Sequence, residues 1–264
     1  MAFLNYEYRM KIKYSKQVDK CYFTIKSIPA NDFRQRNISY EISINPYVPY
    51  SEGVDSFGNL QIIGSEPESH SEFEFIIKGL VETYQVSTQG GVNTGKIGMY
   101  RYPYGKCIPG ETISSFVDEL LVEADKLKDD KEKCILIMNR LYKRMQYEKG
   151  STEIDTTAEE AFSNGKGVCQ DFAHIYITLL RVFSIPARYV CGLIVGEGQS
   201  HAWVEAVCGG SFAAFDPTHN REITDEYIKL GVGRDATDCA INRGVMWGGG
   251  LQTQEIECIV EKYY

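Results

Sequence analysis

The sequence predicts an α+β protein in which antiparallel strands come first and helices follow. Residues 6–14 alternate between apolar and polar side chains, which is the period of a half-buried strand. Residues 113–127 instead carry apolar side chains at the i, i+3, i+4, i+7 spacing of an amphipathic helix. Beyond residue 186 the pattern returns to short strands separated by glycine-containing turns. We therefore expect a first domain made of strands and a second one in which helices pack on an antiparallel sheet.

The chain divides into three parts on these patterns. Residues 1–88 contain strand-like segments and turns, and they predict an antiparallel β-sandwich-like domain. Residues 89–112 are rich in glycine and proline, which is typical of a linker or a long crossing loop. Residues 113–264 would form the second domain, with a closing strand from residue 252 onward. Separate cores are expected for the two domains, so limited proteolysis would cut between residues 88 and 112. The alternative is a tyrosine-rich linker pinned across the interface, for which resistance to cleavage is expected.

The second domain opens with a series of helical patterns. After the first of them, Asp130 begins another stretch with apolar side chains on one face. Thr156 or Thr157 would cap a short helix that follows. A further amphipathic pattern starts at Cys169 and ends before Pro186, since proline cannot continue a helix.

A glycine-rich segment precedes this last helix and places Cys169 in its first turn. Gly165 and Gly167 precede it closely in the sequence. Unpaired backbone N–H groups and the positive end of the helix dipole favour a thiolate at such a position. The plain alternative is a small apolar residue packed in a core, which is how most free cysteines are used. The residues downstream favour the reactive role.

Two short strands follow, with a turn at residues 208–210 between them. His201 and Trp203 share one face of the first strand, and Asp216 lies near the end of the second. Suppose that the strands pair with Asp216 opposite His201 or opposite Trp203. The Cβ atoms of His201 and Asp216 then lie roughly 5–8 Å apart. A slip of one residue would put them on opposite faces. In the favoured registers the carboxylate can orient the imidazole, which can face the thiol of Cys169.

Several ordered motifs carry a family resemblance. They read Gly-Val-Cys-Gln-Asp-Phe-Ala-His (167–174), Ile-Pro-Ala-Arg-Tyr-Val (185–190), His-Ala-Trp-Val-Glu (201–205) and Phe-Asp-Pro-Thr (215–218). With them the chain resembles the bacterial transglutaminase-like cysteine protease family, from about residue 5 to its end. Segments 151–156 and 233–235 match as well, and Asp-Ser-Phe-Gly-Asn at 55–59 resembles the signature of the N-terminal region that accompanies this domain.

The resemblance implies a papain-like, transglutaminase-like core that performs acyl transfer. It makes Cys169 the nucleophile, His201 the base and Asp216 the residue that orients the base. It favours a cysteine peptidase or amidase acting on a peptide or protein substrate. Three departures from the family pattern concern substrate preference. Ser-Phe-Ala-Ala precedes Asp216 where a tryptophan is common, His219 stands where an asparagine is common, and the loop before His201 is short.

Further residues have supporting roles in this interpretation. The backbone N–H of Cys169 is the natural first donor to an oxyanion. Tyr147 and Gln170 are candidates for the second donor or for contact with the substrate. Trp203, on the same strand face as His201, would shield the ion pair from water.

Two other functions remain open on the sequence. An amine in place of water as acyl acceptor would make the protein a protein-glutamine transglutaminase, because the same triad serves both reactions. A catalytically idle binding module is the third reading, against which the complete triad argues. No cofactor is expected, and no metal site either, because no cysteine or histidine pair has the spacing of zinc ligands.

Composition restricts the partners and the compartment. With 264 residues and a net charge of −8, the chain is not expected to bind nucleic acid or to dock electrostatically on anionic membranes. No apolar run approaches the roughly 20 residues of a membrane span. The N-terminus reads as a strand, so we expect a cytoplasmic protein with reduced thiols; removal of a signal peptide is the alternative. The oligomeric state stays open.

Overall fold

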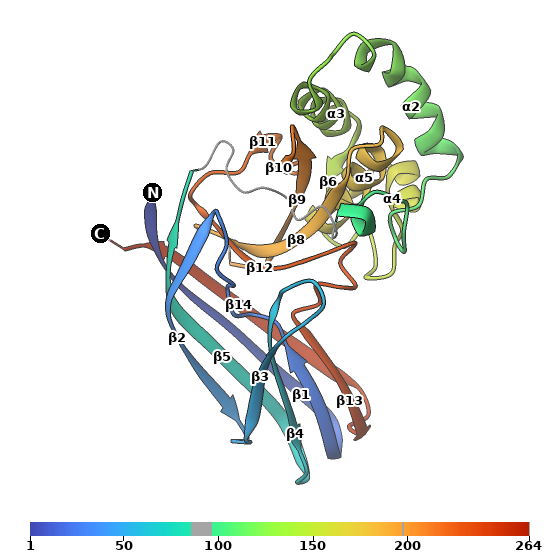
Figure 1. Ribbon diagram of the computed structural model, residues 1–264. Coiled ribbons are helices and arrows are strands. Elements are labelled where there is room, and N and C mark those ends of the chain that lie inside the picture. Colours follow the sequence, from blue (N-terminus) through green and yellow to red (C-terminus); the bar gives the residue numbers. More distant parts are fainter. Residues whose placement is uncertain (86–96, 197, 264) are drawn as a thin grey trace.

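The computed structural model describes residues 1–85, 97–196 and 198–263 of the chain. Figure 1 shows two parts: a long, curled sheet that contains both ends of the chain, and a smaller sheet beside a group of helices. The fold is α+β with mostly antiparallel strands, which confirms the predicted class. Within the described ranges, no helix is both long enough and apolar enough to span a membrane.

The larger sheet is organised around one long strand. Its members are β1 (Ala2–Ile25), β2 (Gln35–Asn45), β3 (Tyr50–Val54), β4 (Leu60–Glu66), β5 (His70–Thr83), β13 (Asn242–Gly248) and β14 (Gln252–Lys262). The first half of β1 pairs with β5 and β14, and the second half pairs with β4 and β13. Tyr6, Tyr8 and Met10 point into the core of this sheet, as their alternation with polar residues predicts.

The C-terminal strands lie elsewhere than the sequence division suggests. That division assigns them to the second domain, whereas in the structure β14 pairs with β1 from Leu4–Lys262 to Tyr14–Gln252. Without β14, one edge of β1 would present a row of unpaired backbone groups, and the pairing with β14 satisfies them. Cys258 and Val260 of β14 complete the same buried core. The two ends of the chain therefore lie close together (Figure 1).

The smaller sheet has the strand order β11-β10-β9-β8-β12 and is joined to helices by one apolar core. The strands are β8 (Ala187–Ile194), β9 (His201–Cys208), β10 (Ser211–Asp216), β11 (Arg221–Glu222) and β12 (Tyr227–Gly233). The helices are α2 (Glu111–Ala124), α3 (Asp130–Arg144), α4 (Ala158–Asn164) and α5 (Cys169–Val182). Thr157 caps α4, because its side chain accepts the backbone N–H of Glu160.

Helix α5 lies in the middle of this core and is buried on nearly every side. Its stripe of Asp171, His174, Thr178 and Arg181 would be the polar face of an amphipathic helix, yet all four side chains are buried. Arg181 shows where such polar groups find partners, because its Nε and Nη2 atoms donate to the carbonyl oxygens of Tyr100, Ala187 and Arg234. The stripe therefore ties surrounding loops to the helix that begins with Cys169.

Two amide side chains, one from β2 and one from the turn between β3 and β4, close the open edge of β12. Gln35 donates to the carbonyl oxygen of Lys229 at 2.8 Å and accepts its backbone N–H at 2.7 Å. Asn59 makes the same pair of bonds to Val232, also at 2.8 and 2.7 Å. A primary amide offers a donor and an acceptor side by side, as a peptide group does. The two side chains thus take the place of a neighbouring strand and join the two parts of the molecule.

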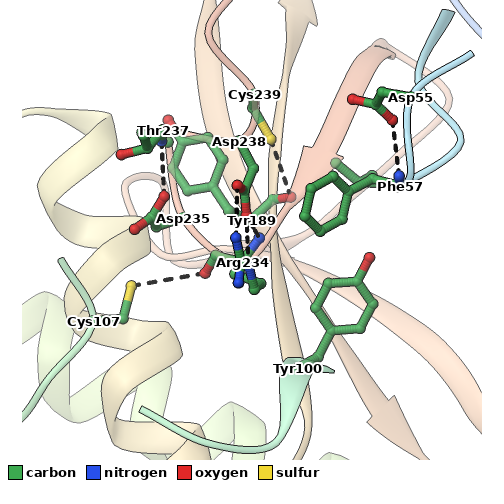
Figure 2. A network of polar contacts seen from close by, with 12 residues as sticks. Asp55, Phe57, Tyr100, Cys107, Tyr189, Arg234, Asp235, Thr237, Asp238 and Cys239 are labelled. Atoms are coloured by element: carbon green, nitrogen blue, oxygen red, sulfur yellow. Dashed lines mark hydrogen bonds and ion pairs between the residues drawn. The ribbon is translucent and has the colours of Figure 1, made fainter. Parts of the chain in front are cut away.

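The turn at residues 55–59 forms a second part of this interface. Asp55 accepts the backbone N–H groups of Phe57 and Asn59 at 2.9 Å each, which fixes the turn. The Phe57 ring faces the guanidinium of Arg234 at 5.6 Å, and Asp238 holds that guanidinium through Nε at 2.9 Å (Figure 2). The signature motif of the N-terminal region therefore contributes to an interface between the two parts.

Part of the stretch that the sequence marks as a linker packs against the helical part. Residues 86–96 lie outside the described ranges. The short helix η1 (Gly98–Tyr100) follows them, and Tyr100 is buried. Further on, Cys107 is buried too, and the backbone N–H of Lys106 donates to Asp235 at 3.2 Å. Residues 100–107 are therefore anchored at several points, which favours resistance to proteolysis there.

Candidate active site

Cys169 is the first residue of α5, and a tight turn sets its position. Gly167 has no room for a side chain, because an added Cβ would lie 2.6 Å from Cβ of Asp171. Asp171 in turn accepts the backbone N–H of Val168 at 2.8 Å and the hydroxyl of Thr152 at 2.7 Å. The helix therefore starts at one defined place. Cys169 lies in its first turn, among backbone N–H groups that have no intrahelical partner.

Tyr147 reaches the same region, whereas Gln170 does not. The short strands β6 (Gln146–Tyr147) and β7 (Lys166–Gly167) pair in parallel, so that Tyr147 lies across from Gly167. Tyr147 lines the cleft that also contains Cys169, and 46% of its surface is exposed. The Gln170 side chain donates instead to the carbonyl oxygen of Ile154 at 3.3 Å. Of the two candidates for an oxyanion donor, only Tyr147 is a cleft residue.

The register of β9 and β10 brings His201 and Asp216 together. Phe215 lies opposite Val204, and the same register continues to set Asp216 across from Trp203. This is one of the two registers expected from the sequence. His201 is then the diagonal neighbour of Asp216 on the same face, and its Nε2 lies 2.9 Å from Oδ2 of the carboxylate. Both side chains are buried.

Asp216 is surrounded by hydrogen-bond donors. Its Oδ2 atom accepts from Nε2 of His201 at 2.9 Å, Nδ1 of His219 at 2.7 Å and the hydroxyl of Tyr227 at 2.8 Å. Its Oδ1 atom accepts the backbone N–H groups of Thr218 at 2.9 Å and His219 at 3.2 Å. These bonds compensate the buried carboxylate and fix its orientation.

The pKa values of His201 and Asp216 move in opposite directions. Burial acts to lower the pKa of His201, but the hydrogen bonds with Asp216 and Cys169 outweigh burial and raise it to about 10. Burial acts to raise the pKa of Asp216, and hydrogen bonds from His201 and His219 bring it well below its usual range. An imidazolium beside a carboxylate is therefore the stable state near neutral pH. Since Nε2 of His201 faces Asp216, Nδ1 is the ring nitrogen that serves Cys169.

The sulfur and the imidazole open onto one cleft of about 530 Å³. Its walls consist of Tyr147, Lys149, Val168, Cys169, Gly198, Gln199, Ser200, His201, Thr218 and His219. Cys169 is partly accessible, whereas the other seven cysteines of the chain are buried. A ligand in this cleft can therefore reach the Cys169 sulfur without any rearrangement of the core.

Trp203 and Glu205 share the strand of His201 and are both buried. The Trp203 ring stacks 6.5 Å from the His201 ring and lies edge-on to Tyr227, so it covers one side of the imidazole. Glu205 is paired with Arg188 at 2.5 Å and with Lys229 at 2.6 Å. These two cations neutralise its buried charge, which makes Glu205 a structural residue of the sheet.

Sequence reasoning assigned no role to two partners of Asp216. His219 stood out only as a departure from the family pattern, although its position three residues after Asp216 places it within a turn's reach. Tyr227 is the first residue of strand β12. The hydrogen bond from Tyr227 to Asp216 depends on the tertiary arrangement of the sheet, and no local sequence pattern predicts it.

Comparison with protein-family models assigns both parts of the chain. Residues 119–217 match the transglutaminase-like superfamily, and this range includes Cys169, His201 and Asp216. Residues 4–82 match the bacterial transglutaminase-like N-terminal region. A solved structure of a candidate cysteine protease from Cytophaga hutchinsonii has a TM-score of 0.79 at 22% identity, and the match covers 98% of this chain and 90% of that one. That likeness establishes the shared fold.

Mycobacterial relatives are similar in sequence. An uncharacterized protein of Mycobacterium leprae is 41% identical over 128 residues, and the chain spans only 45% of the length of that relative. An uncharacterized protein of Mycobacterium tuberculosis is 25% identical over 274 residues, which are 91% of this chain and 86% of that protein. With both family matches in their expected order, residues 119–217 belong to the transglutaminase-like superfamily and residues 4–82 to the bacterial transglutaminase-like N-terminal region.

Proposed function

We propose that this protein is a thiol-dependent acyl-transfer enzyme, a cysteine peptidase or amidase with a Cys169–His201–Asp216 triad. One observation carries the proposal: His201 is held by Asp216 at 2.9 Å on one side and hydrogen-bonded to the accessible Cys169 on the other. A nucleophile and a base thereby share one cleft, and the group that orients the base lies buried behind it. Membership of the transglutaminase-like superfamily supports this kind of chemistry.

The first step is the attack of the Cys169 thiolate on the carbonyl carbon of a peptide or carboxamide. A carbon–sulfur bond forms, and the carbonyl oxygen becomes an oxyanion. The backbone N–H of Cys169 lies in the first turn of α5 and donates to this oxygen, in the positive field of the helix N-terminus. The Tyr147 hydroxyl, on the cleft wall, is our candidate for the second donor.

The second step is the loss of the amine. The His201 imidazolium gives its Nδ1 proton to the leaving nitrogen as the carbon–nitrogen bond breaks, and a thioester on Cys169 remains. The neutral imidazole then takes a proton from the incoming water while that water attacks the thioester. The carbon–sulfur bond breaks, which releases the carboxylic acid and restores the Cys169 thiolate beside the His201 imidazolium. Asp216 stays ionised throughout, because its pKa is far below neutral, and it keeps His201 Nε2 protonated.

The acyl acceptor decides between two enzyme classes. Water gives a peptidase or amidase, which we favour, and an amine gives a protein-glutamine transglutaminase. The cleft is open, so an extended peptide segment is the substrate we propose. Cleavage of a diverse peptide library by the wild type and by Cys169→Ala tests the hydrolase directly. Incorporation of a labelled amine into glutamine peptides, measured in the same samples, tests the transferase.

Matched variants complete this experiment. Cys21→Ala removes a buried thiol of the larger sheet and should leave cleavage intact, whereas Cys169→Ala should abolish it. Tyr147→Phe should lower kcat by about 10²-fold with little change in KM if its hydroxyl stabilises the oxyanion. Cleavage that persists in Cys169→Ala would reject the proposed function, and absence of both reactions in the wild type would favour an idle binding module.

A further inference from the structure

Two histidines share one carboxylate oxygen beside the proposed active site. Nε2 of His201 and Nδ1 of His219 lie 2.9 and 2.7 Å from Oδ2 of Asp216. The three atoms lie within 4.8 Å of one another. The His201 and His219 rings face each other at 5.2 Å, and 37% of the His219 side chain is exposed to the cleft. The proposed reaction uses only one of these two imidazoles.

We propose that His201, Asp216 and His219 form a binding site for Zn²⁺ or a similar transition-metal ion, which inhibits the enzyme. Nε2, Oδ2 and Nδ1 would be the three protein ligands, and a water molecule from the cleft would complete a tetrahedron. The binding claim stands on geometry alone, while the inhibition rests on the proposed function.

A rotation of the His219 ring, which is partly exposed, would adjust the arrangement to accept the ion. Zinc binds histidine nitrogen at about 2.0–2.1 Å and carboxylate oxygen at about 2.0–2.2 Å, so tetrahedral ligand atoms are roughly 3.4 Å apart. The two nitrogen–oxygen separations of 2.9 and 2.7 Å must therefore widen by about 0.5–0.7 Å. The two ring nitrogens, which now lie within 4.8 Å of each other, must come to the same distance of roughly 3.4 Å. The carboxylate is already oriented, because its Oδ1 atom is fixed by the N–H groups of Thr218 and His219. The exposed side of His219 gives the ion its path from the cleft.

The ligand types decide which ions fit. Two imidazoles and one carboxylate suit Zn²⁺, Co²⁺, Ni²⁺ and Cu²⁺, whereas Mg²⁺ and Ca²⁺ prefer sites made of oxygen atoms. Binding replaces the proton on Nε2 of His201 and the proton on Nδ1 of His219, and both leave to solvent. His201 then holds its remaining proton on Nδ1, the nitrogen that serves Cys169. The ring can give up that proton only by becoming an imidazolate, so it no longer protonates the leaving amine and the catalytic cycle stops.

A different mode of metal inhibition must be separated from this one. Zinc could bind between the Cys169 sulfur and Nδ1 of His201, as it does at many reactive thiols. That mode needs the sulfur and does not involve His219. The site proposed here needs His219 and does not involve the sulfur, because Nε2 of His201 faces Asp216.

Zinc affinity of the Cys169→Ala protein, measured by competition with a chromogenic chelator, distinguishes the two modes. We expect Cys169→Ala to keep binding one Zn²⁺, and Cys169→Ala with His219→Asn to bind at least about tenfold more weakly. His70→Asn in the Cys169→Ala background is the matched control, because His70 lies on β5, outside the cleft, and its loss should leave zinc affinity unchanged. Circular dichroism of each variant confirms folding.

Two further measurements make the outcome decisive. Co²⁺ bound to the wild type should show the visible bands of a tetrahedral ion without a sulfur-to-cobalt charge-transfer band. In the active enzyme, His219→Asn should raise the zinc concentration needed for half-inhibition at least about tenfold. Loss of zinc binding in Cys169→Ala, or unchanged affinity after His219→Asn, would overturn the proposed site. An inactive wild type would reject the proposed function but leave the binding result intact.

Discussion

Oδ2 of Asp216 lies 2.9 Å from Nε2 of His201, and the register of β9 and β10 makes the two residues neighbours. The carboxylate is buried, so water does not compete for the hydrogen bonds that orient it. His219 and Tyr227 bind the same oxygen and hold it in place. The contact fixes the tautomer in which Nδ1 of His201 is available to Cys169.

Loss of the carboxylate should therefore lower turnover strongly. We expect Asp216→Ala to reduce kcat by up to about 10⁴-fold, because the imidazole loses both its orientation and its stabilising charge. Tyr227→Phe removes only one of several donors to Oδ2 and should reduce kcat by about tenfold at most. Steady-state kinetics on a cleaved peptide checks both values. Equal rates for Asp216→Ala and the wild type would show that Asp216 is not part of the catalytic apparatus.

The pH dependence of the enzyme should reflect the raised pKa of His201, which lies at about 10. The active pair requires a protonated imidazole, so kcat/KM should persist as pH rises and fall only as His201 loses its proton near pH 10. In Asp216→Asn the pKa of His201 should return toward its ordinary value of about 6.5. The alkaline limb of residual activity should then shift downward by at least one pH unit. An alkaline limb that does not move would contradict the proposed charge pair.

The sequence predicted most of the elements around the site. The helical spacing from Cys169 onward placed the thiol in a first helical turn, and two apolar strands with a glycine turn between them predicted the hairpin of His201 and Asp216. Local periodicity was sufficient there because burial of one face repeats with the period of the element.

Local sequence patterns do not predict which distant elements of the chain contact one another. The C-terminal strands look like any others in sequence, and nothing in their alternation shows that β1 is their partner. The stripe of α5 that includes His174 and Arg181 is polar and yet buried, and surrounding loops supply hydrogen-bond partners to it. Tyr227 meets Asp216 only because β12 lies in the same sheet.

The side-chain amides of Gln35 and Asn59, which hydrogen-bond to the backbone of β12, should stabilise the folded protein. Asn59→Ala or Gln35→Ala leaves a backbone N–H and a carbonyl oxygen of β12 without their partners at a buried edge. Each change should lower the free energy of unfolding by about 1–3 kcal/mol. Asn5→Ala on the exposed side of β1 is the matched control and should cost much less. Urea unfolding measures all three, and equal values for Asn59→Ala and Asn5→Ala would contradict this role of the interface.

Metal removal should not impair catalysis. The proposed reaction uses the Cys169 thiolate and no metal ion, so EDTA should leave peptide cleavage unchanged or raise it in preparations that contain traces of zinc. Alkylation of thiols should abolish cleavage. Activity assays before and after dialysis against EDTA check this expectation. A loss of activity that added zinc restores would count against the cysteine nucleophile.

Selective alkylation of Cys169 tests the central claim most directly. Cys169 is the accessible cysteine of the cleft and is hydrogen-bonded to His201, while the other seven are buried. Burial raises the pKa of Cys107, Cys191 and Cys258 to about 12, which makes those thiols unreactive. Under limiting iodoacetamide at pH 6–7, peptide mapping by mass spectrometry should find Cys169 modified first, and more slowly in His201→Ala. Modification of another cysteine ahead of Cys169 in the folded protein would contradict the account.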